Sequence, residues 1–60
     1  MINKCYIVEW NTENENLFDD LRNFGFKFSF TFIDKNYFEI TITVREEDLR
    51  DLEGVMQWYV

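Results

Sequence analysis

The stretch FKFSFTFIDKNYFEITITV, residues 26–44, decides the fold, because it alternates apolar and polar side chains on both sides of a short polar break. Such alternation places one set of side chains on each face of a β-hairpin. Pairing Phe32 with Phe38 sets Phe30 opposite Ile40 and leaves a three-residue loop, Asp34-Lys35-Asn36. Asn36 is expected in the left-handed conformation, which asparagine tolerates. A one-residue slip would expose the whole phenylalanine stripe, so this register is strongly favoured.

The residues before the hairpin predict a strand followed by a helix. Residues 5–10, CYIVEW, are rich in β-branched and aromatic side chains, which favours a strand. Thr12 and Glu15 have the spacing of a capping box at a helix start, and Gly25 is suited to end that helix. Between them, apolar residues recur at helical spacing, which predicts about three turns with one apolar face. The recurring residues are Leu17, Phe18, Leu21 and Phe24.

The C-terminal third predicts a second helix and leaves its end open. Residues 45–54, REEDLRDLEG, carry acids in the first turn, where the helix dipole favours them, and leucines on one face. Residues 55–60, VMQWYV, either continue this helix or form a fourth strand. Gly54, the β-branched ends and the two aromatic residues favour the strand.

The expected order is therefore β-α-β-β-α-β, a single α+β domain over residues 1–60. Right-handed crossovers would place both helices on one face of an antiparallel sheet, with the phenylalanine stripe beneath them. Phe28, Phe30, Ile40 and Ile42 are expected to be buried together there. This element order resembles the ferredoxin-like fold, which hosts many unrelated activities.

Composition points to a compact protein with an acidic surface. The 60 residues are 47% hydrophobic and 20% aromatic, and their net charge is −6. The negative charge disfavours direct binding to nucleic acid and favours a basic surface on a partner protein. The alternative is that the charge only keeps an aromatic-rich protein in solution.

Few side chains are suited to catalysis or to metal binding. The chain has one cysteine, Cys5, and no histidine, so no internal disulfide, histidine base or soft-ligand metal site is expected. Glu46, Glu47 and Asp48 lack the spacing of a calcium loop. No enzyme activity, cofactor or metal is therefore expected. No apolar run has transmembrane length and no signal peptide is recognisable, so no membrane association is expected and the cytoplasm is the expected location.

Two surfaces are candidates for binding a partner. One is formed by acids on the outer faces of the helices, which imitate a phosphate backbone towards a basic cleft: Asp19, Asp20, Glu47, Asp48 and Asp51. The other is the open face of the sheet, where aromatic and hydroxyl side chains are expected to meet: Tyr6, Val8, Trp10, Thr41 and Thr43. In the alternative orientation of the first strand, Tyr6, Val8 and Trp10 face the core instead, and Cys5 and Ile7 face outwards.

The function expected from these features is binding to another protein. Small size, acidity and a composition rich in Asn, Phe and Ile resemble those of small bacteriophage proteins that inhibit host enzymes or defence systems. That resemblance implies an inhibitor or modulator of a host protein, such as a DNA-mimic inhibitor of a nucleic-acid-processing enzyme, acting in the host cytoplasm. A homodimer is the expected oligomeric state. The alternative is a regulatory domain that binds a small ligand at a homodimer interface.

Overall fold

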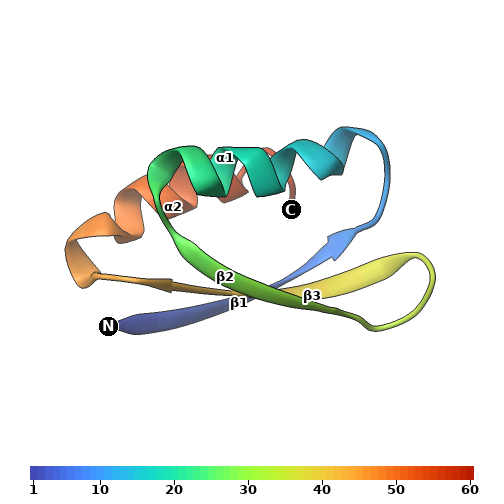
Figure 1. Cartoon of the computed structure of the whole chain (residues 1–60), viewed down its shortest axis with the longest axis horizontal. Coiled ribbons are helices and arrows are strands. Elements are labelled where there is room, and N and C mark those ends of the chain that lie inside the picture. Colours follow the sequence, from blue (N-terminus) through green and yellow to red (C-terminus); the bar gives the residue numbers. More distant parts are fainter.

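The computed structural model describes all 60 residues as a three-stranded antiparallel sheet with two helices on one face (Figure 1). The strands are β1 (Ile2–Glu9), β2 (Lys27–Phe32) and β3 (Tyr37–Val44). The helices are α1 (Asn16–Phe24) and α2 (Leu49–Met56), each preceded by a 3₁₀ turn, η1 (Glu13–Glu15) and η2 (Glu46–Asp48). The predicted α+β class with an antiparallel sheet and two helices is therefore confirmed.

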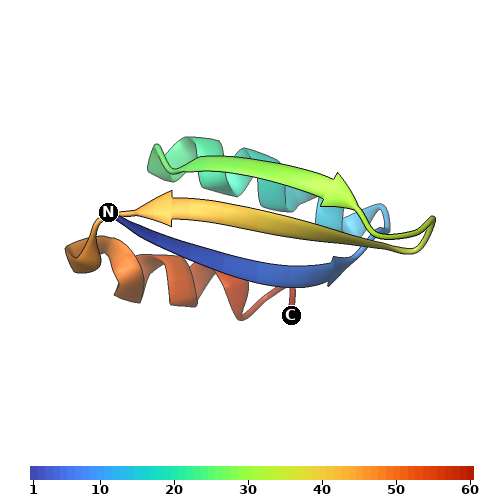
Figure 2. The same ribbon diagram turned by 90° about the horizontal axis from the view of Figure 1, so that it is seen from below.

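Strand β3 lies at the centre of the sheet, in the order β1-β3-β2. The predicted hairpin register is confirmed, since Phe32 pairs with Phe38 and Phe30 with Ile40. Figure 2 shows α1 running along the β2 side of the sheet and α2 along the β1 side. The opposite face of the sheet carries no covering layer.

The hairpin loop closes by a different device from the one predicted. No residue other than Gly25 has a positive φ, so the left-handed conformation expected of Asn36 is wrong. Instead, the Asp34 carboxylate accepts hydrogen bonds from the backbone N–H groups of Asn36 (2.7 Å) and Tyr37 (2.9 Å). An aspartate side chain that replaces a backbone acceptor in this way lets the chain reverse without left-handed geometry.

The first helix begins and ends with local hydrogen bonds. The capping box predicted for Thr12 and Glu15 is wrong, because neither side chain caps the helix. The Asn11 side chain takes that role, accepting from the Asn14 N–H at 2.8 Å. At the other end Gly25 has φ 77°, and the N–H groups of Gly25 and Phe26 return to the carbonyls of Arg22 and Leu21. This paired arrangement is the usual glycine stop of a helix, as predicted.

The fourth strand predicted for residues 55–60 is wrong. Helix α2 passes through Gly54 to Met56 and ends in a turn. Leu52, Val55 and Met56 are all buried, because helical spacing from the leucines keeps them against the sheet. Gly54 falls on the exposed side, so it does not interrupt this packing.

The core is built on the central strand. Ten residues are buried, all of them apolar, and four come from the helix-facing side of β3: Phe38, Ile40, Ile42 and Val44. The expectation that Phe28 and Phe30 would be buried with Ile40 and Ile42 is wrong for the phenylalanines. Phe28 is half-buried, whereas Phe30 is 46% and Phe32 47% exposed. They lie on an edge strand, where only one neighbouring strand covers them.

We predict opposite effects of alanine at the two glycines. A Cβ at Gly54 would contact nothing within 4 Å, so Gly54→Ala should stabilise the helix interior by about 0.5–1 kcal/mol. Gly25→Ala should destabilise the protein by about 1 kcal/mol or more, because Gly25 has a left-handed φ of 77°. Urea unfolding of both variants measures the two free energies. A loss of stability in Gly54→Ala would show that α2 does not continue through residue 54.

Candidate protein-binding surfaces

The net charge of the protein is confined to its helical half. The sheet strands and their hairpin hold three lysines and three acids, which cancel. Residues 11–24 and 45–60 hold the other nine acids and three arginines, which together account for the whole charge of −6. The helix layer, meaning η1, α1, η2 and α2 with the C-terminal turn, is therefore a strongly negative face, and the sheet layer is neutral.

The five acids predicted to bind a partner differ in their surroundings. Asp19 is 3.4 Å from Arg22, and Arg45 approaches Glu47 (3.1 Å) and Asp48 (3.3 Å). These exposed ion pairs contribute little to stability, but they offset part of the local negative charge. Three of the five acids therefore lie beside an arginine.

Asp20 and Asp51 lie together in a groove between the helices. The groove has a volume of about 410 Å³, and α1 and α2 with the turn that follows contribute all of its lining: Asp20, Phe24, Arg50, Asp51, Gly54, Val55 and Trp58. Trp58 is 79% and Phe24 53% exposed. The groove thus combines two acids and one arginine with two uncovered aromatic rings. Acids beside aromatic rings are suited to a basic partner that carries an apolar side chain.

Sequence reasoning missed Phe24 as a candidate binding residue and misplaced Trp58. A fourth strand would put either Trp58 or Tyr59 beside the open sheet face, and the helical spacing puts Phe24 on the apolar face of the first helix. Trp58 is exposed in the turn that ends α2, because the helix continues past Gly54. Phe24 stacks on Phe26 at the end of α1 (ring centroids 5.4 Å apart) but remains half-exposed. The helical spacing from Leu49 and Leu52 through Val55 and Met56 was the signal that could have revealed Trp58.

A hydrogen bond from Tyr59 to Asp20 joins the C-terminal turn to α1. Burial, together with this bond and the charges of Asp20 and Asp19, raises the pKa of the Tyr59 hydroxyl to about 12 from its ordinary 10.0. Because Asp20 is engaged with Tyr59, Asp51 is the groove acid for which no ion pair or side-chain hydrogen bond is formed.

The open sheet face has a different composition from the one predicted. Val8 is buried and Tyr6 half-buried, and both pair with β3 residues that face the helices, so the predicted placement of Tyr6, Val8 and Trp10 on the open face is wrong. The alternative orientation is confirmed, since Cys5 and Ile7 face outwards. The physical reason is register, because Val8 opposite Phe38 completes the core whereas Ile7 opposite Glu39 cannot.

Thr41 and Thr43 do lie on the open face, where each meets a β1 side chain. The Thr43 hydroxyl donates to the Asn3 side-chain oxygen at 2.8 Å, and the Thr41 hydroxyl lies 3.4 Å from the Cys5 sulfur. Ile7 and Tyr37 are the exposed apolar side chains beside them, at 60% and 44%. This face is mixed in character and bears only scattered apolar area.

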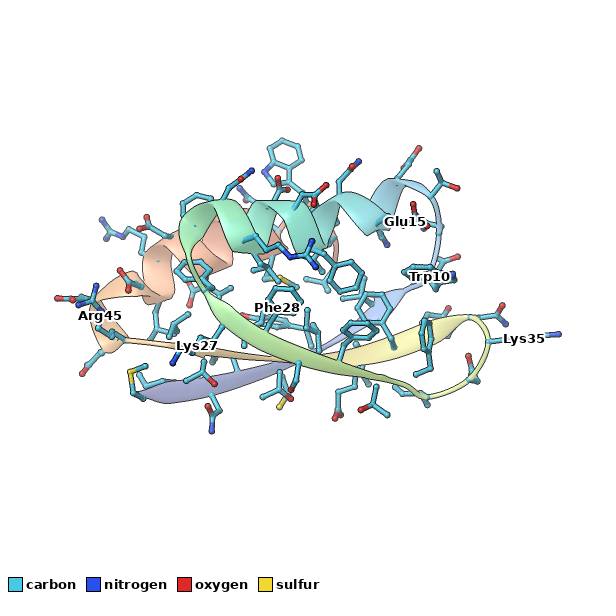
Figure 3. The ribbon with its side chains drawn as sticks, in the orientation of Figure 1. Trp10, Glu15, Lys27, Phe28, Lys35 and Arg45 are labelled. Atoms are coloured by element: carbon cyan, nitrogen blue, oxygen red, sulfur yellow. The ribbon has the colours of Figure 1, made fainter.

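Trp10 belongs to an aromatic cluster at one end of the sheet. Its ring centroid lies 5.4 Å from Phe32, 6.0 Å from Phe38 and 6.5 Å from Phe18. Figure 3 shows Trp10 and Phe28 between the sheet and the helices. Trp10 and the phenylalanine rings of β2 remain partly exposed, and together they form the second aromatic surface of the molecule.

No group of side chains suited to hold a metal ion is formed. Cys5 is exposed and has no histidine or basic partner, and no three acidic or cysteine side chains gather as metal ligands. No helix has the length and apolarity needed to cross a bilayer.

Comparison with known proteins gives no relative of this chain. No protein-family model, curated protein sequence or solved structure matches it.

We predict that Tyr59 makes the protein lose stability at alkaline pH. The unfolded tyrosine loses its proton near its ordinary pKa of 10.0, whereas the folded one keeps it to about 12. The stabilisation is therefore fully present below pH 10 and is lost as the pH rises towards 12. Tyr59→Phe should remove this part of the pH dependence, and Asp20→Asn should shift the late tyrosine titration to lower pH. Absorbance titration and denaturant unfolding measure both effects. Burial and the charge of Glu53 also raise the pKa of Tyr6, so a smaller late titration remains in Tyr59→Phe. A late titration of unchanged amplitude in Tyr59→Phe would contradict the assignment.

Proposed function

We propose that this protein is a non-enzymatic binding protein whose helix layer docks on a basic surface of another protein and thereby inhibits or modulates it. The observation that carries the proposal is the confinement of the entire −6 charge to the helix layer, around a groove with two exposed aromatic rings. A charge held on one face attracts and orients a basic partner during encounter.

The groove supplies the short-range part of this recognition. Aromatic side chains in pockets dominate the energy of many interfaces, while surrounding charges mainly set the association rate. Trp58 and Phe24 would bury an apolar side chain of the partner, and Asp51 would pair with a neighbouring lysine or arginine. A basic cleft that binds nucleic acid has this chemistry, so an inhibitor of a nucleic-acid-processing enzyme is the form of the proposal that we favour.

A second candidate is a regulatory domain that binds a small ligand at a homodimer interface. The observation that favours it is the uncovered sheet face with Ile7 and Tyr37 exposed, which a second copy could cover. The two candidates use opposite faces of the molecule, so residues on each face separate them.

The partner is first identified by a photo-crosslinking amino acid placed at position 50, which lines the groove without replacing Trp58, Phe24 or Asp51. Position 7 on the open face is the matched control. The proposal predicts one stoichiometric protein crosslinked from position 50 and none from position 7. Crosslinking of a second copy from position 7, without a foreign protein at position 50, would contradict it and support the regulatory domain.

We predict that binding to the identified partner depends on salt and on the groove. Affinity should fall as ionic strength rises from about 50 to about 500 mM, because the screening length of exposed charges shortens from about 14 to about 4 Å over this range. Trp58→Ala should weaken binding at least about tenfold, a typical loss for a central aromatic residue. Asp51→Asn should mainly slow association, and Ile7→Ala should change nothing. Calorimetry and surface plasmon resonance give these values; affinity indifferent to salt and to Trp58→Ala would overturn the proposal.

A further inference from the structure

Strand β2 is a free sheet edge whose outward backbone groups can be assigned from two hydrogen bonds. The Ile33 N–H donates to the Tyr37 carbonyl (3.0 Å), and the Trp10 N–H donates to the Asn36 carbonyl (2.7 Å). In antiparallel ladders, bonding to one neighbour alternates along the strand. Tyr37 and every second residue after it therefore bond to β2, and Asn36 and every second residue after it bond to β1.

It follows which residues of β2 face away from the sheet. Ser29 and Thr31 lie opposite Thr41 and Glu39, so their N–H and carbonyl groups bond to β3. Phe28, Phe30 and Phe32 direct theirs outwards. The same three residues carry the partly exposed rings on the helix side, so unpaired backbone groups and uncovered aromatic surface coincide on one edge.

This edge lacks the protection that the other edge has. Sheet edges are commonly guarded by charged side chains, including charges that point towards the core side. Strand β1 has such a charge, since Lys4 lies opposite Ile42 on the helix-facing side. The only charged residue of β2 is its first, Lys27, which lies opposite Thr43 on the open face. From Phe28 to Ile33 the edge has no charged residue.

The position of α1 limits what can occupy the edge. Paired strands lie about 4.7–4.9 Å apart, whereas packed helices need about 8–10 Å. Figure 2 shows α1 along β2, and Phe18 of α1 packs on Phe28 and Phe30 with ring centroids 5.7 and 4.8 Å apart. A second copy paired through β2 would bring its own α1 into the same space, so a bare extended strand fits this edge and a second copy does not.

Charged residues on the β2 side of α1 indicate which side chains the incoming strand should carry. The Arg22 guanidinium lies 5.9 Å from the Phe28 ring centroid, which places Arg22 and its ion-pair partner Asp19 on the β2 side of the helix. Glu15 lies about one turn before Asp19 and forms no ion pair. A lysine or arginine on the incoming strand would meet this acid.

We propose that the β2 edge binds an extended segment of a partner protein as a fourth strand, with apolar side chains at alternate positions and a basic residue near Glu15. Its alternate residues would exchange backbone hydrogen bonds with Phe28, Phe30 and Phe32 and cover their rings. This surface is separate from the helix groove of the proposed function.

The test uses a synthetic peptide of sequence TVTVTVK, capped at both ends, and the same peptide with N-methylated valines. Amide hydrogen exchange of the full protein is followed by NMR. Without peptide, the amides of Phe28, Phe30 and Phe32 should exchange quickly and those of Ser29 and Thr31 slowly. With the unmethylated peptide at millimolar concentration, the three phenylalanine amides should slow at least about tenfold, as expected for newly formed ladder bonds. Amides of the β1 edge should not change.

Two variants at position 30 distinguish peptide binding through backbone hydrogen bonds from binding through contact with the phenylalanine ring alone. Phe30→Pro removes an outward N–H that no folded-state bond uses, and proline is tolerated at such edge positions. It should weaken peptide binding about tenfold or more, whereas Phe30→Ala keeps the N–H and should weaken it less. Trp58→Ala and Asp51→Asn should leave peptide binding unchanged, which keeps this test independent of the groove.

Three results would overturn the inference. They are an absence of protection with the unmethylated peptide, equal protection by the methylated peptide, and protection that rises with protein concentration alone. The last would show that a second copy occupies the edge. If Phe30→Pro fails to fold, the methylated peptide with the native protein still decides the matter.

Discussion

The structure depends on the packing of one face of β3 between two edge strands and beneath two helices. Phe38, Ile40, Ile42 and Val44 are almost completely buried, and every other buried residue packs against them. A chain of this size can enclose only a small core, so a central strand that is covered on both sides and from above uses its apolar residues most efficiently. Both helices take their positions from this stripe.

Because the core is small, aromatic surface remains uncovered at two places. The helices bury the β3 stripe but do not reach far enough to enclose the β2 rings, and the end of α2 leaves Trp58 in solvent. In a protein that acts by binding, these are the areas that a partner would cover. The charge distribution separates them, because the groove lies in the negative helix layer and the β2 edge borders the neutral sheet.

Alternation in residues 26–44 was sufficient to predict the hairpin, its register and the strand that follows the loop, because a slip would exchange the two faces. The orientation of β1 could not be read from CYIVEW, since both faces of that strand carry apolar side chains and only pairing with β3 separates them. The end of α2 was mispredicted because Gly54 suggests a stop, whereas burial of Val55 and Met56 overrides that preference.

Site prediction from the sequence met the same limits. Asp19, Asp20 and Asp51 lie on the helices as predicted, whereas Glu47 and Asp48 lie in the 3₁₀ turn before α2. Ion pairing with Arg22 and Arg45 depends on side-chain geometry that spacing alone does not give. The groove could not be predicted, because it depends on how the two helices lie relative to each other. Trp58 lines the groove only because α2 is longer than predicted. To predict that Phe30 is exposed, one must know that β2 is an edge strand. The hairpin pattern does not give the strand order.

The claim on which this account rests is that Phe30 of β2 is a surface residue and Phe38 of β3 is a core residue. Phe38→Leu and Phe30→Leu make the same chemical change on facing strands, at side chains that are 0% and 46% exposed. Denaturant unfolding should show a loss of about 1–2 kcal/mol for Phe38→Leu and less than half of that for Phe30→Leu. Equal losses in the two variants would contradict the account, because they would show that β2 is as fully enclosed as the central strand.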